Sequence, residues 1–307
     1  MSRLISHNSL AQMWSILREL PARRPDLLLT YNWGSMEWAL VNRFLRVSRH
    51  VHFEDGFSQQ EADSQLRRRV LIRRFALAAT RKVVVPSQTF VCLALHDWHL
   101  HPDRVLHIPN GIDADAFSSS DNHDPLFERR PGDLVVGTIA PLRPEKNIGR
   151  LIRAVARAGN KRLRLVVAGD GSERPALERE ARELLGDRAL FLGLVSPPSR
   201  ALRDFDIFAL SSDTEQMPMT ILEAIAMARP IVAVAVGDVP VMVADENRPF
   251  IVQKHDEAKL SAAISQLAED GELRSRLGKL NEHHVRATFP LGRMIASYDA
   301  LLTSMVR

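Results

Sequence analysis

Short apolar segments alternate with segments of helical spacing along most of the chain, and this alternation constrains the fold more than any other feature. Residues 207–210 and 231–236 are uninterrupted apolar runs, whereas residues 147–158 repeat apolar side chains at the three- and four-residue spacing of a helix. Strands that alternate with helices of roughly 10 to 18 residues are typical of a parallel, wound sheet. We therefore predict an α/β protein.

The chain is long enough for two such sheets. Its 307 residues fit two domains of ordinary size, and a polar, proline-containing break at 118–133 separates two series of alternating segments. We predict a first domain over residues 1–120 and a second over 121–290. Two closing helices are expected, one over 261–277 and one over 291–307 that packs back toward the first domain.

All of the excess positive charge lies in the first 120 residues. They contain 15 Lys and Arg against 11 Asp and Glu, which accounts for the whole net charge of +4. Seven of these cations fall within Arg67–Lys82, a largely helical segment. A basic helix can bind an anionic membrane or a nucleic acid, or it can simply present a solvated face. Nucleic acid is the least favoured partner, because the basic excess is local.

Composition favours a cytoplasmic protein. Apolar residues make up 45% and charged residues 25%, as in soluble globular proteins, and no apolar run approaches the roughly 18 residues of a membrane span. The N-terminus lacks the charged-then-apolar pattern of a secretory signal, and the single cysteine, Cys92, cannot form an internal disulfide. Peripheral contact with the inner face of a membrane through Arg67–Lys82 is an alternative to a fully cytoplasmic location.

The segment 211–234 is the most informative one for function, because it combines a loop, a helix start and a second strand. Pro218 suits the first helical position, which would make Met217 the N-cap. A methionine side chain cannot cap, so the amides of Met219 and Thr220 lack a side-chain acceptor. Such a helix start is a ready anion site.

Two glutamates belong to the same segment. Glu215 lies in the loop before the helix, and Glu223 lies about one and a half turns inside it. They are either acceptors for the hydroxyl groups of a ligand or surface carboxylates beside a hydrated helix start.

Other strand-to-helix turns converge on the same edge of the predicted sheet. The turn from Gly169 to Gly171 opens a helix, although Arg174 stands where a dinucleotide fingerprint needs a third small residue. Gly137 precedes a second turn that carries Arg143 and Lys146. Ligands gather at the carboxyl ends of strands in open α/β sheets. Two cations, glycine turns and an uncapped helix start together indicate a diphosphate site.

Three further features give weaker indications. Asp55, in a Glu-Asp-Gly turn at the end of a first-domain strand, is either part of an ordinary polar turn or a contact to substrate. Ser87 suits a helix cap better than a nucleophile. The four histidines within residues 96–107 lack convergent ligand spacing, so we expect surface or packing residues and no metal.

Taken together, these motifs resemble glycosyltransferase family 4, the retaining enzymes of the GT-B fold also described as glycosyl transferases group 1. The resemblance runs from about residue 26 to the C-terminus. It rests on these segments: Asn110 to Asp113 with Phe117, Gly137 with Lys146 and Asn147, Gly169 to Gly171 with Leu177 and Glu178, Phe191 to Gly193, and Glu215 with Glu223.

The resemblance implies two Rossmann-like domains whose parallel sheets face a cleft. Lys146, with Arg143, would neutralise the diphosphate of a nucleotide-sugar donor held by the second domain. Glu215 would hold sugar hydroxyls and Glu223 ribose hydroxyls, while Asp55 would face the substrate from the first domain. No metal or other cofactor would be needed. The remaining donor-binding positions would be Gly137, Gly169, Gly171, Gly193, Met217, Pro218, Met219 and Thr220.

The sequence departs from the family pattern in several places. Pro141 replaces the family's arginine five residues before Lys146, Gln216 replaces the glycine after the first glutamate, and Asp55 takes the place of the family's first-domain histidine. The resemblance also places Met1 near the third or fourth element of the family. We therefore expect an incomplete first domain without the opening strand and the glycine-rich loop.

The resemblance implies a retaining hexosyltransferase of polysaccharide biosynthesis, which moves a sugar from a nucleotide-sugar donor to a glycan or lipid-linked acceptor. Two alternatives remain. A non-catalytic relative or partner subunit would bind the donor without turnover, whereas a sugar-nucleotide epimerase would convert the donor without any acceptor.

Overall fold

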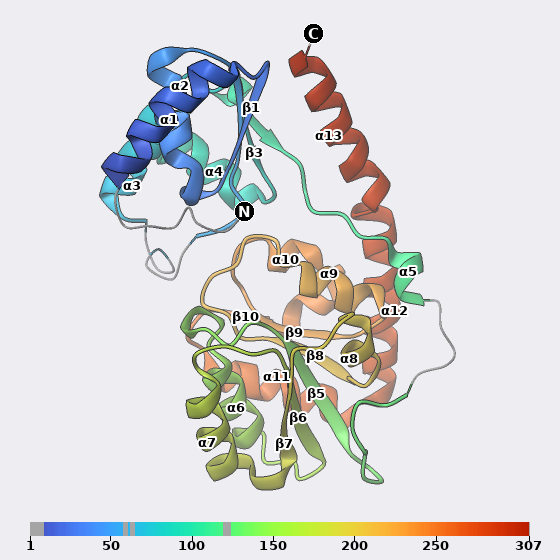
Figure 1. The fold of residues 1–307 in the computed structure, drawn as a ribbon. Helices are drawn as coiled ribbons and strands as arrows, with labels where there is room; N and C mark the ends of the chain where they lie inside the picture. Colours follow the sequence, from blue (N-terminus) through green and yellow to red (C-terminus); the bar gives the residue numbers. More distant parts are fainter. Residues whose placement is uncertain (1–8, 58–60, 62–64, 119–123, 307) are drawn as a thin grey trace. The chain divides into compact units, whose positions relative to one another are not determined.

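The computed structural model divides into two compact units, which we call unit 1 and unit 2 (Figure 1). Unit 1 comprises Met1–Pro109 with Ile295–Arg307, and unit 2 comprises Asn110–Met294. The chain first leaves unit 1 after Pro109, whereas the sequence analysis places the boundary at residue 120. The domain limits derived from the sequence remain a prediction. The part of the chain that the structure describes is residues 9–57, 61, 65–118 and 124–306.

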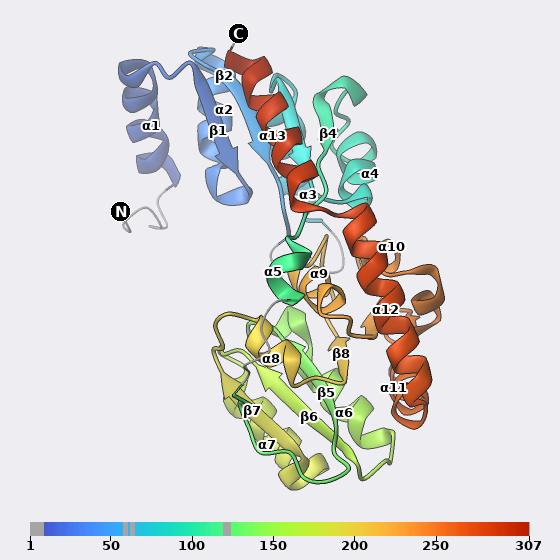
Figure 2. The same ribbon diagram turned by 90° about the vertical axis from the view of Figure 1, so that its right-hand side faces the viewer.

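Unit 1 is built on a parallel four-stranded sheet in the order β1-β2-β3-β4 (Figure 2). The strands are β1 (Leu27–Tyr31), β2 (Arg49–Phe53), β3 (Lys82–Val85) and β4 (Val105–His107). The helices of unit 1 are α1 (Ser9–Arg23), α2 (Met36–Leu45), α3 (Arg67–Leu77), α4 (Gln88–His96), the short η1 (Trp33–Ser35) and η3 (Pro102–Arg104), and most of α13 (Leu291–Val306).

The core of unit 1 forms where helices cover this sheet. Val83 and Val85 of β3 pack against Leu77 of α3 and Phe90 of α4, all of them almost fully buried. The near-continuous apolar run of β3 is expected for a parallel strand that is covered on both faces. Ser87 caps α4 by accepting a hydrogen bond from the amide of Phe90, which confirms the prediction from sequence.

Unit 2 contains a parallel six-stranded sheet in the order β10-β9-β8-β5-β6-β7 (Figure 1). The strands are β5 (Leu134–Ile139), β6 (Leu163–Ala168), β7 (Ala189–Gly193), β8 (Ile207–Leu210), β9 (Ile231–Val234) and β10 (Ile251–Val252). The helices are α5 (Ala114–Ser118), η4 (Pro144–Lys146), α6 (Ile148–Arg157), α7 (Arg174–Leu185), η5 (Gly186–Arg188), α8 (Ser199–Arg203), α9 (Met219–Ala226), α10 (Val239–Met242), η6 (Asp245–Phe250), α11 (Glu257–Glu269) and α12 (Gly271–Thr288).

Successive residues of β6 pack into two different cores, because side chains alternate between the faces of a strand. Leu165 and Val167 join the helices α6, α7 and α11. Val166 and Ala168 join α8 and α9 instead. Helices on both faces of a parallel sheet confirm the predicted α/β architecture.

The prediction of a single helix over 261–277 is wrong. The chain forms α11 and α12 there, and the break falls at Asp270. The carboxylate of Asp270 accepts a hydrogen bond from the amide of Leu273 and so caps α12. An Asp-Gly pair inside an apolar periodic segment is a start signal that hydrophobic spacing alone does not reveal.

Within the described residues, every helix is too short or too polar to cross a lipid bilayer.

Candidate functional site

An ion pair between Lys146 and Glu215 lies at the carboxyl edge of the unit 2 sheet. The Lys146 Nζ is 2.6 Å from the Oε1 of Glu215, which also accepts a hydrogen bond of 2.7 Å from the Ser212 hydroxyl. Lys146 ends η4, in the loop that follows β5, and Glu215 lies between β8 and α9. Parallel strands β5 and β8 are neighbours, so their loops meet at one edge.

This ion pair borders a cavity of about 150 Å³. The start of α9 forms a second wall of the cavity, and the segment that follows β5 forms a third. The polar or turn residues of the lining are Thr138, Pro141, Lys146, Ser211, Ser212, Glu215, Pro218 and Thr220. The structure thus brings together two of the sequence-predicted catalytic residues and three of the predicted helix-start residues, since Met219 also lines the cavity.

The start of α9 differs from the prediction by one position. Pro218 is the N-cap and Met219 the first helical residue, so Met217 is not the cap. Met217 is buried, and its carbonyl accepts a hydrogen bond of 2.9 Å from the Asn110 side chain. The extended backbone of Pro218 (ψ 124°) explains the shift, since the residue before the first helical one is not yet helical. No side chain caps α9, as predicted.

A second group of polar residues, missed in the sequence analysis, positions the two loops. Asp213 accepts hydrogen bonds from the Asn147 amide (3.0 Å) and the Arg150 guanidinium (2.6 Å). Arg150 is almost fully buried and also donates to the carbonyl of Ser211. These contacts tie the loop before α6 to the loop after β8. The signal available in the sequence was the Ser-Ser-Asp run directly after a buried strand.

Gly237 holds the backbone of the Glu215 loop in place. Its φ is +52°, and a Cβ built there would lie 2.4 Å from the carbonyl oxygens of both Glu215 and Gln216. Only glycine fits this approach without displacing the loop.

Two predicted donor-binding glycines serve close backbone packing between neighbouring turns. A Cβ on Gly169 would lie 1.9 Å from the Ala140 oxygen, and one on Gly171 would lie 2.4 Å from the Leu142 oxygen. The turn after β6 therefore lies directly against the loop after β5. Gly193 closes β7 with a φ of +72°, and its carbonyl accepts a hydrogen bond from the Gly169 amide.

Gly137 has a packing role that the sequence did not reveal. It lies inside β5, where a Cβ would come within 2.1 Å of the Phe205 ring. The missing side chain makes room for that buried ring. A contact of Gly137 with a donor stays a prediction.

Arg143 and Glu223 lie outside the set of cavity-lining residues. Arg143 is exposed at the start of η4. Glu223 is half-buried on α9, and desolvation raises the pKa of its carboxyl. Within the described residues, the Glu223 carboxylate has no ion-pair or hydrogen-bond partner. An unpartnered, partly buried carboxylate is available to accept hydrogen bonds from a ligand.

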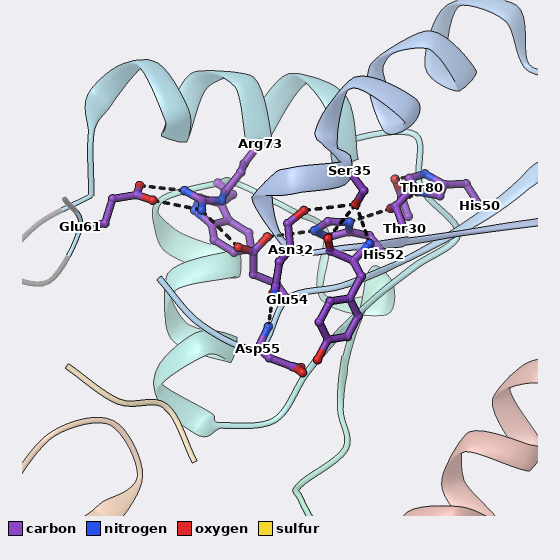
Figure 3. A network of polar contacts seen from close by, with 12 residues as sticks. Thr30, Asn32, Ser35, His50, His52, Glu54, Asp55, Glu61, Arg73 and Thr80 are labelled. Atoms are coloured by element: carbon purple, nitrogen blue, oxygen red, sulfur yellow. Dashed lines mark hydrogen bonds and ion pairs between the residues drawn. The ribbon is translucent and has the colours of Figure 1, made fainter. Parts of the chain in front are cut away.

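Asp55 belongs to unit 1, at the carboxyl end of β2. Its amide donates a hydrogen bond of 2.7 Å to the side chain of Asn32, whose own φ is +54° (Figure 3). Asp55 is exposed as a residue, yet desolvation of its carboxyl raises its pKa. Burial and the nearby Asp55 charge raise the pKa of Tyr298 as well.

Next to Asp55, unit 1 contains a buried polar network that the sequence analysis did not predict (Figure 3). His52 lies 2.9 Å from the Glu54 carboxylate, which pairs with Arg73 at 3.2 Å. Arg73 also pairs with Glu61 at 2.9 Å. Burial opposes ionisation of Glu61, but hydrogen bonds from Arg73 and Arg69 hold its pKa below the ordinary value.

The described residues contain no group of three His, Cys, Asp or Glu side chains arranged to hold a metal ion.

Two family models match the chain, one for each half. The model for glycosyltransferase family 4 matches residues 2–116, and the model for glycosyl transferases group 1 matches residues 133–270. The second match contains Lys146 and Glu215.

Curated relatives that match the chain are named as glycosyltransferases. A D-inositol 3-phosphate glycosyltransferase of Corynebacterium glutamicum is 29% identical over 69% of this chain and 54% of the relative. One of Stackebrandtia nassauensis is 35% identical over 61% of this chain and 46% of the relative. The chain therefore spans about half the length of the curated relatives it matches.

Solved structures share the fold. Anabaena HepE in complex with UDP superimposes with a TM-score of 0.80 at 18% identity, over 96% of this chain and 82% of that one. Sucrose-phosphate synthase from Thermosynechococcus elongatus gives a TM-score of 0.79 at 20% identity, over 97% of this chain and 79% of that one. Because family models match both halves of the chain and solved structures share its two parallel α/β units, the chain belongs to glycosyltransferase family 4 and has the GT-B fold.

Proposed function

We propose that the chain is a retaining hexosyltransferase that moves a sugar from a nucleotide-sugar donor to a glycan or lipid-linked acceptor. The observation that carries this proposal is the Lys146–Glu215 pair beside the uncapped start of α9. A cation, a carboxylate and free helix amides are the groups that a sugar diphosphate requires.

Each of these groups has a distinct task in the proposal. The Lys146 ammonium and the first amides of α9 act on the diphosphate, where negative charge develops as the glycosidic bond breaks. One preorganised donor of this kind contributes about 2.7–4 kcal/mol to a transition state. Glu215 uses one oxygen for Lys146 and Ser212, and its other oxygen has no partner within the described residues, so it can accept a sugar hydroxyl.

Glu223 and Arg143 complete the donor side of the proposal. Glu223 accepts hydrogen bonds from the ribose hydroxyls, and Arg143 adds positive charge near the diphosphate from its exposed position in the loop. Asp55 acts from the first domain, on the sugar or the acceptor.

A panel of UDP-, GDP- and ADP-sugars tests donor binding by thermal shift. UDP-sugars come first, because Anabaena HepE is solved with UDP and with UDP-glucose. A donor at 100 times its dissociation constant adds about 2.7 kcal/mol of stability. No shift with any donor would contradict a donor site at Lys146 and Glu215.

Turnover distinguishes the proposal from its alternatives. A transferase releases the nucleoside diphosphate faster when a competent acceptor is added, and D-inositol 3-phosphate, named in the relatives, is one acceptor to test. Binding without release favours a donor-binding subunit, and conversion of the donor without acceptor favours an epimerase. The anomeric configuration of the product, read by proton NMR, decides between retention and inversion.

We also propose that no metal takes part, because Lys146 and the helix amides carry the charge compensation. Unchanged turnover in excess EDTA supports this proposal. Loss of activity in EDTA that only an added divalent cation reverses contradicts it.

The basic segment Arg67–Lys82 is proposed as a peripheral contact with an anionic membrane. Its helix α3 exposes Leu71 (63%) and Phe75 (44%) beside the exposed cations Arg67, Arg68 and Arg74. Apolar side chains between cations favour a membrane surface. Cosedimentation with phosphatidylglycerol vesicles, absent with phosphatidylcholine, tests this contact.

A further inference from the structure

A cavity of about 480 Å³ lies in unit 1, at the amino ends of β2 and β3. It is larger than the cavity beside Lys146, and its volume is typical of a small-molecule site. The end of α2, the loop to β2, the end of α3 and the residues before β3 form its walls. Because Asp55 lies at the carboxyl end of β2, this cavity is at the opposite end of the same strand.

Four arginines line this cavity, which we call the arginine cavity: Arg43, Arg46, Arg49 and Arg81. All twelve lining residues are described, and none of them is an aspartate or a glutamate. Arg49 donates to the carbonyl of Met305, and Arg43 stacks on Phe75 at 4.3 Å. Within the described residues, the guanidinium groups of Arg46 and Arg81 have no ion-pair or hydrogen-bond partner.

The floor of the arginine cavity is polar and fixed. His50 and Thr80 are buried there and lie 2.9 Å apart, and His50 also contacts Thr30 at 2.7 Å (Figure 3). Burial and the neighbouring His52 lower the pKa of His50 to about 3, so its ring is neutral. The cavity's uncompensated charge therefore comes from its arginines.

Two hydrogen bonds close the loop that carries Arg46. The buried Asn42 donates to the Ser48 carbonyl (2.9 Å) and accepts from the Ser48 amide (3.0 Å). The hydroxyl of Ser48, a lining residue, is shielded from solvent and has no partner within the described residues. A buried, unpaired hydroxyl is costly unless a ligand or water satisfies it.

We propose that the arginine cavity binds a phosphoryl-bearing anion, at a site separate from the donor diphosphate. Several guanidinium groups around one cavity fit the oxygens of a phosphoryl group, which accept planar, paired N–H donors. Arg46 and Arg81 supply the free donors, and Arg43 supplies a further charge. The source is either a soluble phosphate or a lipid headgroup, since the exposed Phe44 lies beside Phe75 and Arg43.

Arginine modification by phenylglyoxal, mapped by mass spectrometry on the full chain, tests the proposal site by site. Inorganic pyrophosphate is the soluble probe. At ten times its dissociation constant, about a tenth of the sites remain free, so modification of Arg46 and Arg81 should slow about tenfold. Arg67 and Arg68, exposed at the start of α3, are internal references that should keep their rates.

Two double variants that each remove two positive charges distinguish binding in the arginine cavity from nonspecific attraction to positive charge. In the double variant R46Q/R81Q the protection of Arg43 by pyrophosphate should disappear at the same concentration, whereas in R67Q/R68Q it should persist. Loss of charge-assisted hydrogen bonds from two arginines predicts a tenfold or greater loss of affinity, roughly. An unchanged tryptophan emission spectrum confirms that each variant is folded.

Vesicles identify the source of the phosphoryl group. Protection by pyrophosphate assigns a soluble phosphate. Protection of Arg46 and Arg81 by phosphatidylglycerol vesicles but not by pyrophosphate, with the exposed Arg179 of unit 2 unaffected, assigns a lipid headgroup. No protection by either probe, or equal slowing of Arg46, Arg81, Arg67 and Arg68 by pyrophosphate, would overturn the proposal.

Discussion

The two units use ion pairs at the carboxyl ends of their strands in opposite ways. In unit 2, the side chains of Lys146 and Glu215 are 20% and 12% exposed and line a cavity. In unit 1, those of Arg73 and Glu54 are 1% and 0% exposed. A partly exposed pair can exchange its partners for those of a ligand, whereas a buried pair cannot open without leaving a charge in the interior.

The surroundings of the two cations explain this difference. The Arg73 guanidinium lies within 5.3 Å of the rings of Trp33, Phe57 and Trp98, which enclose it, and two carboxylates neutralise it. Among the described residues, Lys146 pairs with only the Glu215 carboxylate and otherwise faces the cavity. We infer that the unit 1 network fixes structure and that the unit 2 pair serves binding.

Removing the buried cation should give the largest effect. Arg73→Met leaves Glu54 and Glu61 without their shared partner, and breaking a buried pair in this way typically costs about 3–5 kcal/mol. All four tryptophans of the chain lie within residues 1–109, so tryptophan fluorescence during urea unfolding reports unit 1 alone.

The matched control is Arg74→Met, which removes the same charge from the next, exposed position of α3. It should change stability by about 0.5 kcal/mol or less. Equal losses in the two variants would mean that the buried network does not stabilise unit 1, and the contrast between the units would fail.

Loss of the partly exposed Lys146–Glu215 pair should affect turnover rather than folding. Lys146→Ala removes the cation assigned to the diphosphate, so turnover of the preferred donor should fall about 10²–10³-fold. Steady-state kinetics and calorimetry on the same sample separate activity from stability. Arg143→Ala should lose less, because Arg143 lies outside the cavity lining, and the remote, exposed Lys161→Ala should lose nothing.

The clustering of predicted residues in unit 2 could be inferred from the sequence because these residues belong to short, local motifs. Lys146 follows the apolar strand β5, and Glu215 and Pro218 follow the apolar strand β8. Parallel strands bring their carboxyl ends to one edge of the sheet. The N-cap of α9 was misplaced by one residue, since spacing does not fix the backbone angles at a helix end.

The network of unit 1 was not predictable in the same way. His52, Glu54 and Arg73 are polar residues from two separate elements, and each alone has the appearance of a surface residue in the sequence. Their burial depends on tertiary pairing, which neither periodicity nor composition encodes. The arginine cavity was not predicted for the same reason, because Arg46 and Arg81 are far apart in sequence.

Gly137→Ala tests whether this glycine serves packing or the donor. The new Cβ would overlap the buried Phe205 ring, and overpacking of a core typically costs about 1–3 kcal/mol. Calorimetry is the appropriate measurement, because unit 2 has no tryptophan or tyrosine. Combining the change with Phe205→Leu should recover part of the loss. A normal melting temperature with weakened donor binding would instead favour the donor role.

Glu223→Gln should give the smallest change in stability, and it should stabilise rather than destabilise the fold at neutral pH. Desolvation raises the pKa of Glu223 in the folded protein, so the folded state holds its proton more tightly than the unfolded chain. The ionised carboxylate therefore destabilises the fold at neutral pH, and the glutamine variant should melt slightly higher at pH 7. This difference should shrink as the pH falls through the raised pKa of Glu223 and disappear below the ordinary pKa of a glutamate, because the carboxyl is then neutral in both states. If Glu223 accepts the ribose hydroxyls, the same variant should bind the donor about tenfold more weakly.

Calorimetry between pH 4 and 8 (roughly the range in which carboxyl linkage is measurable), with and without the donor, measures both effects. A variant that is no more stable at pH 7 and binds the donor normally would show that Glu223, unlike Lys146, does not belong to the binding side of the comparison.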